Sequence, residues 1–516
     1  MPCTLRSAFA GSVHGLFVPH RLHLWLSGEY EDYPRAESRG EDPAREATMV
    51  HEQIHLFQSC MTGFGFISWS AYQQAVLRLV QSWRRHQEGA NQLALPLSHL
   101  ADRSLRDFAF AYLEQVVNTQ LLLPVAFRSF VPGGVVCFDD LRDPYFAGDW
   151  PLLPTIEVGG ANRQLQGRQV LEGHAMHLES VYSFLINDIP IDAARDGVDD
   201  DYTVALDWFL ETCGTNRLLE FPLICDLALQ TPWELDVKNE RLWQQSHPAW
   251  RFVQLSTALR HSNPSPMRSP EEAIARYSEY CDLLTDACGF PRIGKVLTDF
   301  AARLPDHEDS PEDRIRFRNA LRFRIDHPWC GANPFLDIRA WIEMCKLFPP
   351  LTMQVGESLR IVQRSGQTHT SYTIGNDPEY LTAILNLHMD ALASQILGQR
   401  RLGEADADQL QCGYAFHRIK RGCAFQETGA CGGSFVPSHG LPVPLIDLGG
   451  DEVFGCSFGT ILRLLGVSVA TIDVQYSKGQ LTQQDVDAVE RRLVRLKELG
   501  ISIESGLSPS SKDSQI

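Results

Sequence analysis

The chain has no long hydrophobic run and no excess of positive charge, and these absences exclude several classes of protein. No apolar stretch approaches the ~20 residues that a membrane-spanning helix requires, so we expect no membrane association. The 516 residues include 46 Lys and Arg against 64 Asp and Glu, a formal net charge of −18. Such acidity argues against nucleic acid as a partner. Residues 1–17 are interrupted by polar residues and glycines, and they lack the apolar core of a signal peptide.

The thirteen cysteines form no compact framework of the kind that stabilises small secreted domains. Their odd number and scattered spacing predict thiols that are mostly reduced and a cytoplasmic location. Hydrophobic residues make up 44% of the chain and charged residues 21%, which is typical of a globular protein. The length allows roughly two to four domains with a sizeable core.

Local patterns predict a mainly α chain of the α+β type, with small sheets near each end. Alternating leucines in residues 14–30 indicate one or two strands. The Gly-rich segment TGFGFIS, residues 62–68, predicts a turn, and residues 188–202 predict a loop. Apolar periodicity predicts helices over residues 44–60, 69–86, 103–122, 168–187, 203–213, 271–287 and 482–499.

Residues 50–58 read VHEQIHLFQ and contain the most chemically specific pattern in the chain. On a helix, His51 and His55 project from one face one turn apart, so both imidazoles can reach one ion. This ligand set favours Zn²⁺, at about 2.0–2.1 Å per Zn–N bond. Glu52 lies about 100° around the helix from His51, where its carboxylate can take a proton from a water molecule beside the ion. The alternative is a helix whose two histidines are satisfied by ordinary hydrogen bonds.

A catalytic zinc ion takes three protein ligands and leaves one position open. No further histidine follows closely after His55, so we expect the third ligand on a separate helix. Residues 169–182, QVLEGHAMHLESVY, supply the best candidate, Glu172. The alternative is an amphipathic core helix with solvated polar residues, and Glu211 is the reserve candidate for the ligand.

The neighbours of Glu172 also suggest roles in the site. Gly173 and Ala175 are small enough to let this helix pack closely against the helix that carries the two histidines. Glu179 lies near the same face as Glu172, where it can orient a metal-binding histidine. His174 and His177 are alternative ligands, or candidates for stabilising an oxyanion.

The motif HEQIH followed at a distance by LEGHA resembles the glutamate-zincins, or gluzincins. The resemblance implies a zincin-like core in which one Zn²⁺ per chain is held by His51, His55 and Glu172. It also implies that Glu52 is the general base of peptide-bond hydrolysis. These two short motifs carry the resemblance, which covers about residues 15–230.

From this interpretation and from changes in composition we expect four parts. They are a zincin-like metallohydrolase core in residues 1–245, a helical region in 246–400, a Cys- and Gly-richer α/β region in 401–505 and a disordered tail in 506–516. The expected partner is a peptide or protein substrate. Two other functions stay open: hydrolysis of a non-peptide amide, and non-enzymatic binding or regulation by a chain that retains the zincin-like core. The intact Glu52 favours an enzyme.

Three further patterns carry weaker signals. Residues 455–459, GCSFG, match a nucleophile elbow at Ser457, but no histidine follows it as that mechanism requires. Asp226 lies in the apolar segment 218–233 and needs a partner, either as support for the metal site or as a cap. A second, structural metal site is less favoured than buried free thiols, because no C-x₂-C pair occurs among its candidate ligands Cys412, Cys423, Cys431, Cys456 and His417.

Overall fold

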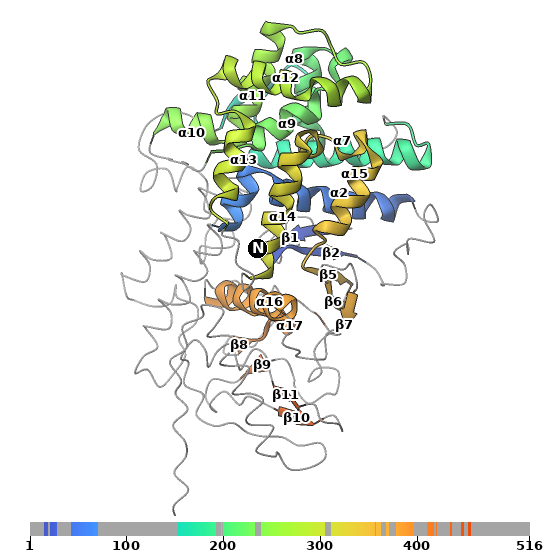
Figure 1. Ribbon diagram of the computed structural model, residues 1–516, viewed down its shortest axis with the longest axis vertical. Helices are drawn as coiled ribbons and strands as arrows, with labels where there is room; N and C mark the ends of the chain where they lie inside the picture. Colours follow the sequence, from blue (N-terminus) through green and yellow to red (C-terminus); the bar gives the residue numbers. More distant parts are fainter. Residues whose placement is uncertain are drawn as a thin grey trace, which may run out of the picture. The chain divides into compact units, whose positions relative to one another are not determined.

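The computed structural model is mainly helical with small sheets, which confirms the predicted fold class (Figure 1). The described residues up to His369, except Pro311, form one compact unit, and those from Thr370 form a second. No helix among the described residues is both long and apolar enough to cross a membrane. The structure describes residues 15–18, 21–27, 43–70, 153–191, 198, 200–232, 239–304, 311–356, 358–362, 368–370, 378–396, 410–416, 419, 434–435, 445–447 and 453–455.

A five-stranded sheet has the strand order β1-β2-β5-β6-β7. Strand β2 pairs antiparallel with β1 and parallel with β5, and β5 pairs antiparallel with β6. Leu24 and Leu26 of β2 pack with Val355 of β5, and Met49 of helix α2 (Pro43–Met61) joins this cluster. The sheet consists of β1 (Gly15–Val18), β2 (His23–Leu26), β5 (Thr352–Val355), β6 (Ser358–Val362) and β7 (Thr368–Thr370).

Helix α2 (Pro43–Met61) carries the HEQIH motif. Its core stripe repeats at the spacing of a helix face and consists of Val50, Ile54, Phe57 and Met61, all at most 5% exposed. His51, His55 and Gln58 repeat at the same spacing on the neighbouring stripe. The helix therefore packs on one stripe and presents polar side chains on the next.

The predicted turn at residues 62–68 is wrong, because residues 63–70 are helical. Thr62 Oγ1 donates a hydrogen bond to the Gln58 carbonyl (2.6 Å) at the junction between the two helical segments. A side chain at Gly65 would collide with the Ser59 backbone. The glycines thus permit a tight junction between two helices, where sequence composition suggested a loop.

Helix α7 (Gly167–Asn187) begins with a capping box formed by Gln166 and Gln169. It packs against α2 on one side and against α8 (Asp200–Cys213) on another. A Cβ at Gly173 would lie 3.4 Å from the Ala205 Cβ and 3.4 Å from the Tyr202 carbonyl oxygen, both in α8. The expectation that Gly173 brings α7 close to α2 is therefore wrong, since this glycine faces α8.

An apolar core lies among α7, α8, α9 (Phe221–Leu229), α11 (Pro248–Ser262) and α12 (Pro270–Cys288). Every residue of α9 is buried, including Asp226. Its carboxylate pairs with Arg324 of α14 (Glu312–Asp326) and accepts a hydrogen bond from the Tyr277 hydroxyl (2.7 Å). Asp226 thus has the partner that its apolar surroundings require.

The remaining elements of the first unit are β3 (Thr155–Val158), β4 (Ala161–Gln164), η5 (Thr215–Arg217), α10 (Glu240–Ser246), α13 (Ile293–Ala301), η6 (Pro328–Gly331), η7 (Pro334–Leu336) and α15 (Ile338–Leu347). The second unit contains α16 (Pro378–Ile396), β8 (Leu410–Gln411), α17 (Gly413–Phe416), β9 (Ser434–Phe435), β10 (Leu445–Asp447) and β11 (Val453–Gly455).

Several predicted features lie outside the described residues. They are residues 71–86 of the helix predicted over 69–86, the helices over 103–122 and 482–499, Ser457, and Cys423, Cys431, Cys456 and His417. The eight cysteines that the structure does describe, Cys412 among them, are free thiols. The domain limits at residues 245, 400 and 505 stay predictions.

Candidate metal centre

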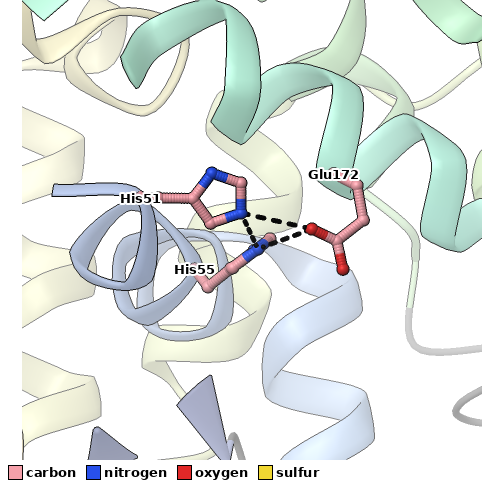
Figure 2. A group of neighbouring side chains, drawn as sticks. All are labelled: His51, His55 and Glu172. Atoms are coloured by element: carbon pink, nitrogen blue, oxygen red, sulfur yellow. Dashed lines mark hydrogen bonds and ion pairs between the residues drawn. The ribbon is translucent and has the colours of Figure 1, made fainter. Parts of the chain in front are cut away.

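His51, His55 and Glu172 meet from two helices that are distant in the sequence, and Figure 2 shows their polar atoms converging. The His51 Nε2 and His55 Nε2 atoms lie 3.1 Å apart. Glu172 Oε2 lies 3.2 Å from the first and 3.1 Å from the second. A tetrahedral ion with bonds of about 2.0–2.1 Å holds its ligand atoms about 3.3–3.4 Å apart. This nearly equilateral triangle therefore fits the ligand set of a metal ion.

The Nδ1 atom of each imidazole also has a polar partner outside the triangle. His51 Nδ1 lies 2.9 Å from Glu179 Oε2, and His55 Nδ1 lies 2.7 Å from Gln58 Oε1. Carboxylates, which only accept hydrogen bonds, face both ring nitrogens of His51, Glu179 at Nδ1 and Glu172 at Nε2. A metal ion at the triangle would require the tautomer with its proton on Nδ1, and Glu179 accepts that proton. Glu179 therefore contacts the ring nitrogen of His51 at which a carboxylate can orient the imidazole.

The charges around the triangle favour a cation at its centre. Burial alone would lower the pKa of His51, but hydrogen bonds to Glu172 and Glu179 raise it well above its ordinary value. Burial would raise the pKa of Glu172, yet His55 and His51 hold it well below its usual range. The protein therefore stabilises positive charge between these side chains, and either a proton or a metal ion can supply it.

Glu52 lies beside the triangle and is not part of it. Burial raises the pKa of its carboxyl to about 7, although His51 and His55 act in the opposite direction. The Phe17 backbone in β1 also hydrogen-bonds to this carboxylate. At Gly15, in the same strand, a Cβ would lie 2.7 Å from both Glu52 Cγ and Glu52 Oε1. Strand β1 therefore confines the Glu52 side chain.

We expect Gly15→Ala to destabilise the protein by about 1–3 kcal/mol, because the added methyl group overpacks the contact with Glu52. The measurement is urea unfolding at neutral pH. Gly294→Ala is the matched control, since a Cβ at that helical position meets nothing within 4 Å. The control should gain about 0.4–1 kcal/mol. Equal effects of the two substitutions would show that β1 does not confine Glu52.

Three residues near the triangle escaped sequence reasoning. Arg168 Nε donates to Glu172 Oε1 (3.3 Å) from one turn earlier in α7, and Gln58 stands three residues after His55 in α2. Each lies three or four residues from a candidate ligand on the same helix, so the helical repeat could have predicted both contacts. The Tyr202 ring lies 5.8 Å from the His51 ring between centroids. It comes from α8, so no local pattern connects it to the motif.

The other candidates lie elsewhere. His174 has both ring nitrogens within hydrogen-bond distance of other groups, Gln58 Nε2 at 3.1 Å and the Ala332 carbonyl at 2.7 Å. The His177 ring is buried with its edge toward Phe221, 5.5 Å between centroids. The placement of these two histidines gives no support for a ligand or oxyanion role. Glu211 is exposed and accepts a hydrogen bond from the Gly159 backbone, away from the triangle.

Comparison of the chain with protein-family models, with curated proteins and with solved structures found no match. Within the described residues, His51, His55 and Glu172 are the one group of His, Cys, Asp or Glu side chains arranged to hold a metal ion. The candidate site is therefore described by its own side chains, two imidazoles and one carboxylate.

Proposed function

We propose that this chain is a zinc-dependent hydrolase that cleaves peptide bonds. The observation that carries the proposal is the triangle of His51 Nε2, His55 Nε2 and Glu172 Oε2, with edges of 3.1–3.2 Å. Two imidazoles and a carboxylate, with a fourth position open, form a ligand set of catalytic zinc. A general-base candidate, Glu52, stands next to them and is not needed as a ligand.

In this proposal each side chain has a distinct task. A zinc ion bound by the three ligands would polarise the scissile carbonyl and lower the pKa of a water molecule to about 7. Glu52 accepts the proton of the attacking water and passes it to the leaving group. Glu179 keeps the His51 ring in the orientation that directs Nε2 inward.

The choice of a peptide substrate depends on the resemblance of HEQIH and LEGHA to the glutamate-zincins. The helical setting of both motifs, in α2 and α7, supports that resemblance. We therefore propose a peptide or protein substrate, and the net charge of −18 continues to argue against nucleic acid.

Zinc content tests the proposal directly. The wild-type protein, loaded with zinc and separated from free metal, is expected to carry about one equivalent per chain. His55→Ala should carry less than about a tenth, because two protein ligands hold zinc far more weakly than three. His261→Ala is the matched control, since this histidine is exposed at the end of α11. Elemental analysis by mass spectrometry gives the three values.

Wild type with less than about a tenth of an equivalent would end the proposal, because a site that fits zinc this closely must retain it. Equal zinc in the His55→Ala variant and in the wild type would place the metal elsewhere in the chain.

A further inference from the structure

We propose that Gln58 is a positioning residue that sets the tautomer of His55 and links the two helices that carry the metal ligands. The proposal rests on the metal site proposed above. Gln58 is 4% exposed and lies one turn beyond His55 in α2. Its amide contacts three groups: His55 Nδ1, the Leu171 carbonyl and His174 Nδ1.

The Leu171 carbonyl decides which way the Gln58 amide is turned. A carbonyl oxygen only accepts hydrogen bonds, so Gln58 Nε2 must face it, at 3.0 Å. Gln58 Oε1 then faces His55 Nδ1 at 2.7 Å and requires a proton there. A neutral imidazole carries one proton, so a proton held on Nδ1 leaves His55 Nε2 a lone pair that points at the triangle and opposes the tautomer that Glu172 Oε2, 3.1 Å from Nε2, would favour. The amide thus selects the tautomer that can bind a metal ion.

His174 holds the amide in the same orientation. The second N–H of Gln58 Nε2 lies 3.1 Å from His174 Nδ1, which accepts it because His174 Nε2 donates to the Ala332 carbonyl at 2.7 Å. Turning the amide over would place Gln58 Oε1 against two acceptors, the Leu171 carbonyl and His174 Nδ1. Both contacts therefore oppose the reversed orientation, and His174 is fully buried.

The position of Leu171 gives the amide a second effect. Leu171 directly precedes Glu172 in α7, so one side chain of α2 holds both the ring of a ligand and the backbone beside another ligand. His51 is oriented differently, by the carboxylate of Glu179. Without Gln58, His55 could carry its proton on either nitrogen and turn about its side-chain bonds. Residues that orient metal ligands in this way typically contribute 10–100-fold in metal affinity.

The test compares Gln58→Leu with Gln230→Leu, a matched control. Gln230 is 1% exposed, accepts a hydrogen bond from the Gly63 backbone (3.2 Å) and donates one to Asp226 (3.1 Å). The Gln230→Leu variant therefore also loses a buried, hydrogen-bonded amide, but one that does not contact the residues of the triangle. Both variants should melt at lower temperature than wild type. Competition with a chelator should show zinc affinity reduced about 10–100-fold for Gln58→Leu and within about 3-fold of wild type for Gln230→Leu.

A conservative variant separates orientation from packing. Gln58→Glu places an oxygen against the Leu171 carbonyl and His174 Nδ1, so it should lower the melting temperature as Gln58→Leu does. It retains an acceptor for His55 Nδ1, so its zinc affinity should still lie closer to wild type than that of Gln58→Leu. Equal zinc affinities of Gln58→Leu and Gln230→Leu would overturn this inference while leaving the metal site intact. Wild type that binds no zinc would overturn the proposed function as well.

A measurement on the wild type covers the case in which Gln58→Leu does not fold. Nitrogen-15 spectra of histidine-labelled, metal-free protein at mildly alkaline pH distinguish the two tautomers of each neutral ring. We expect His55 with its proton on Nδ1 and His174 with its proton on Nε2. A His55 ring protonated on Nε2, or an equal mixture of tautomers, would contradict the role of Gln58.

Discussion

Glu52→Gln is expected to bind zinc as wild type does and to lose hydrolysis by about 10²–10⁴-fold, the contribution of a well-placed general base. Glutamine keeps the shape of glutamate and one acceptor oxygen, but it cannot take up the proton of the attacking water. Glu52 lies outside the triangle of ligand atoms, so the variant should retain about one zinc per chain. Cleavage of a peptide library, followed by mass spectrometry, measures the activity beside zinc analysis and a thermal melt.

The same experiment separates the enzyme from the alternatives. A binding or regulatory protein with a zincin-like core would show no cleavage by either protein and equal binding of any partner. An amidohydrolase for non-peptide substrates would leave the peptide library intact, yet the variant would still lose activity on small amides. Equal peptide cleavage by wild type and Glu52→Gln, insensitive to a metal chelator, would refute the mechanism.

Asp226→Leu is expected to cost about 3–5 kcal/mol of the free energy of unfolding, because it leaves Arg324 as a buried charge without its partner. Both side chains are completely buried, and the Tyr277 hydroxyl and Gln230 Nε2 also lose an acceptor. Urea unfolding at neutral pH measures the loss.

The double variant Asp226→Leu/Arg324→Met tests the cause of that loss. Replacing both members of a buried ion pair by apolar side chains is often neutral or stabilising, so this variant should be more stable than Asp226→Leu alone. If the double variant is as unstable as the single one, or less stable, the unpaired Arg324 charge is not the source of the loss.

The spacing of HEQIH was enough to place His51 and His55 on one helix face, because that relation depends only on the helical repeat. The sequence offers Glu172 as a candidate third ligand, but the packing expected of its neighbour Gly173 is wrong. Gly173 was expected to face α2, and it faces α8. Which side of a buried helix meets which neighbour depends on packing across the whole core, and a single helix does not encode it.

Residues 62–68 show a second limit of the sequence. Their glycines resemble a turn by composition, but a turn and a tight junction between helices both require residues without side chains. Only the position of the Ser59 backbone, which excludes a side chain at Gly65, distinguishes the two. Tyr202 was missed for a related reason, since it reaches His51 from a third helix.

The parallel pairing of β2 with β5 has a consequence for the order of events during synthesis. His23 and Thr352, joined across these strands by a 2.8 Å hydrogen bond, are 329 positions apart. At about 5–20 residues per second, a ribosome needs about 15–65 s to make the intervening chain. During that time the HEQIH segment exists without β5, without Ala332 and, at first, without Glu172. The five-stranded sheet is therefore completed only late in translation, long after the three residues of the triangle have been made.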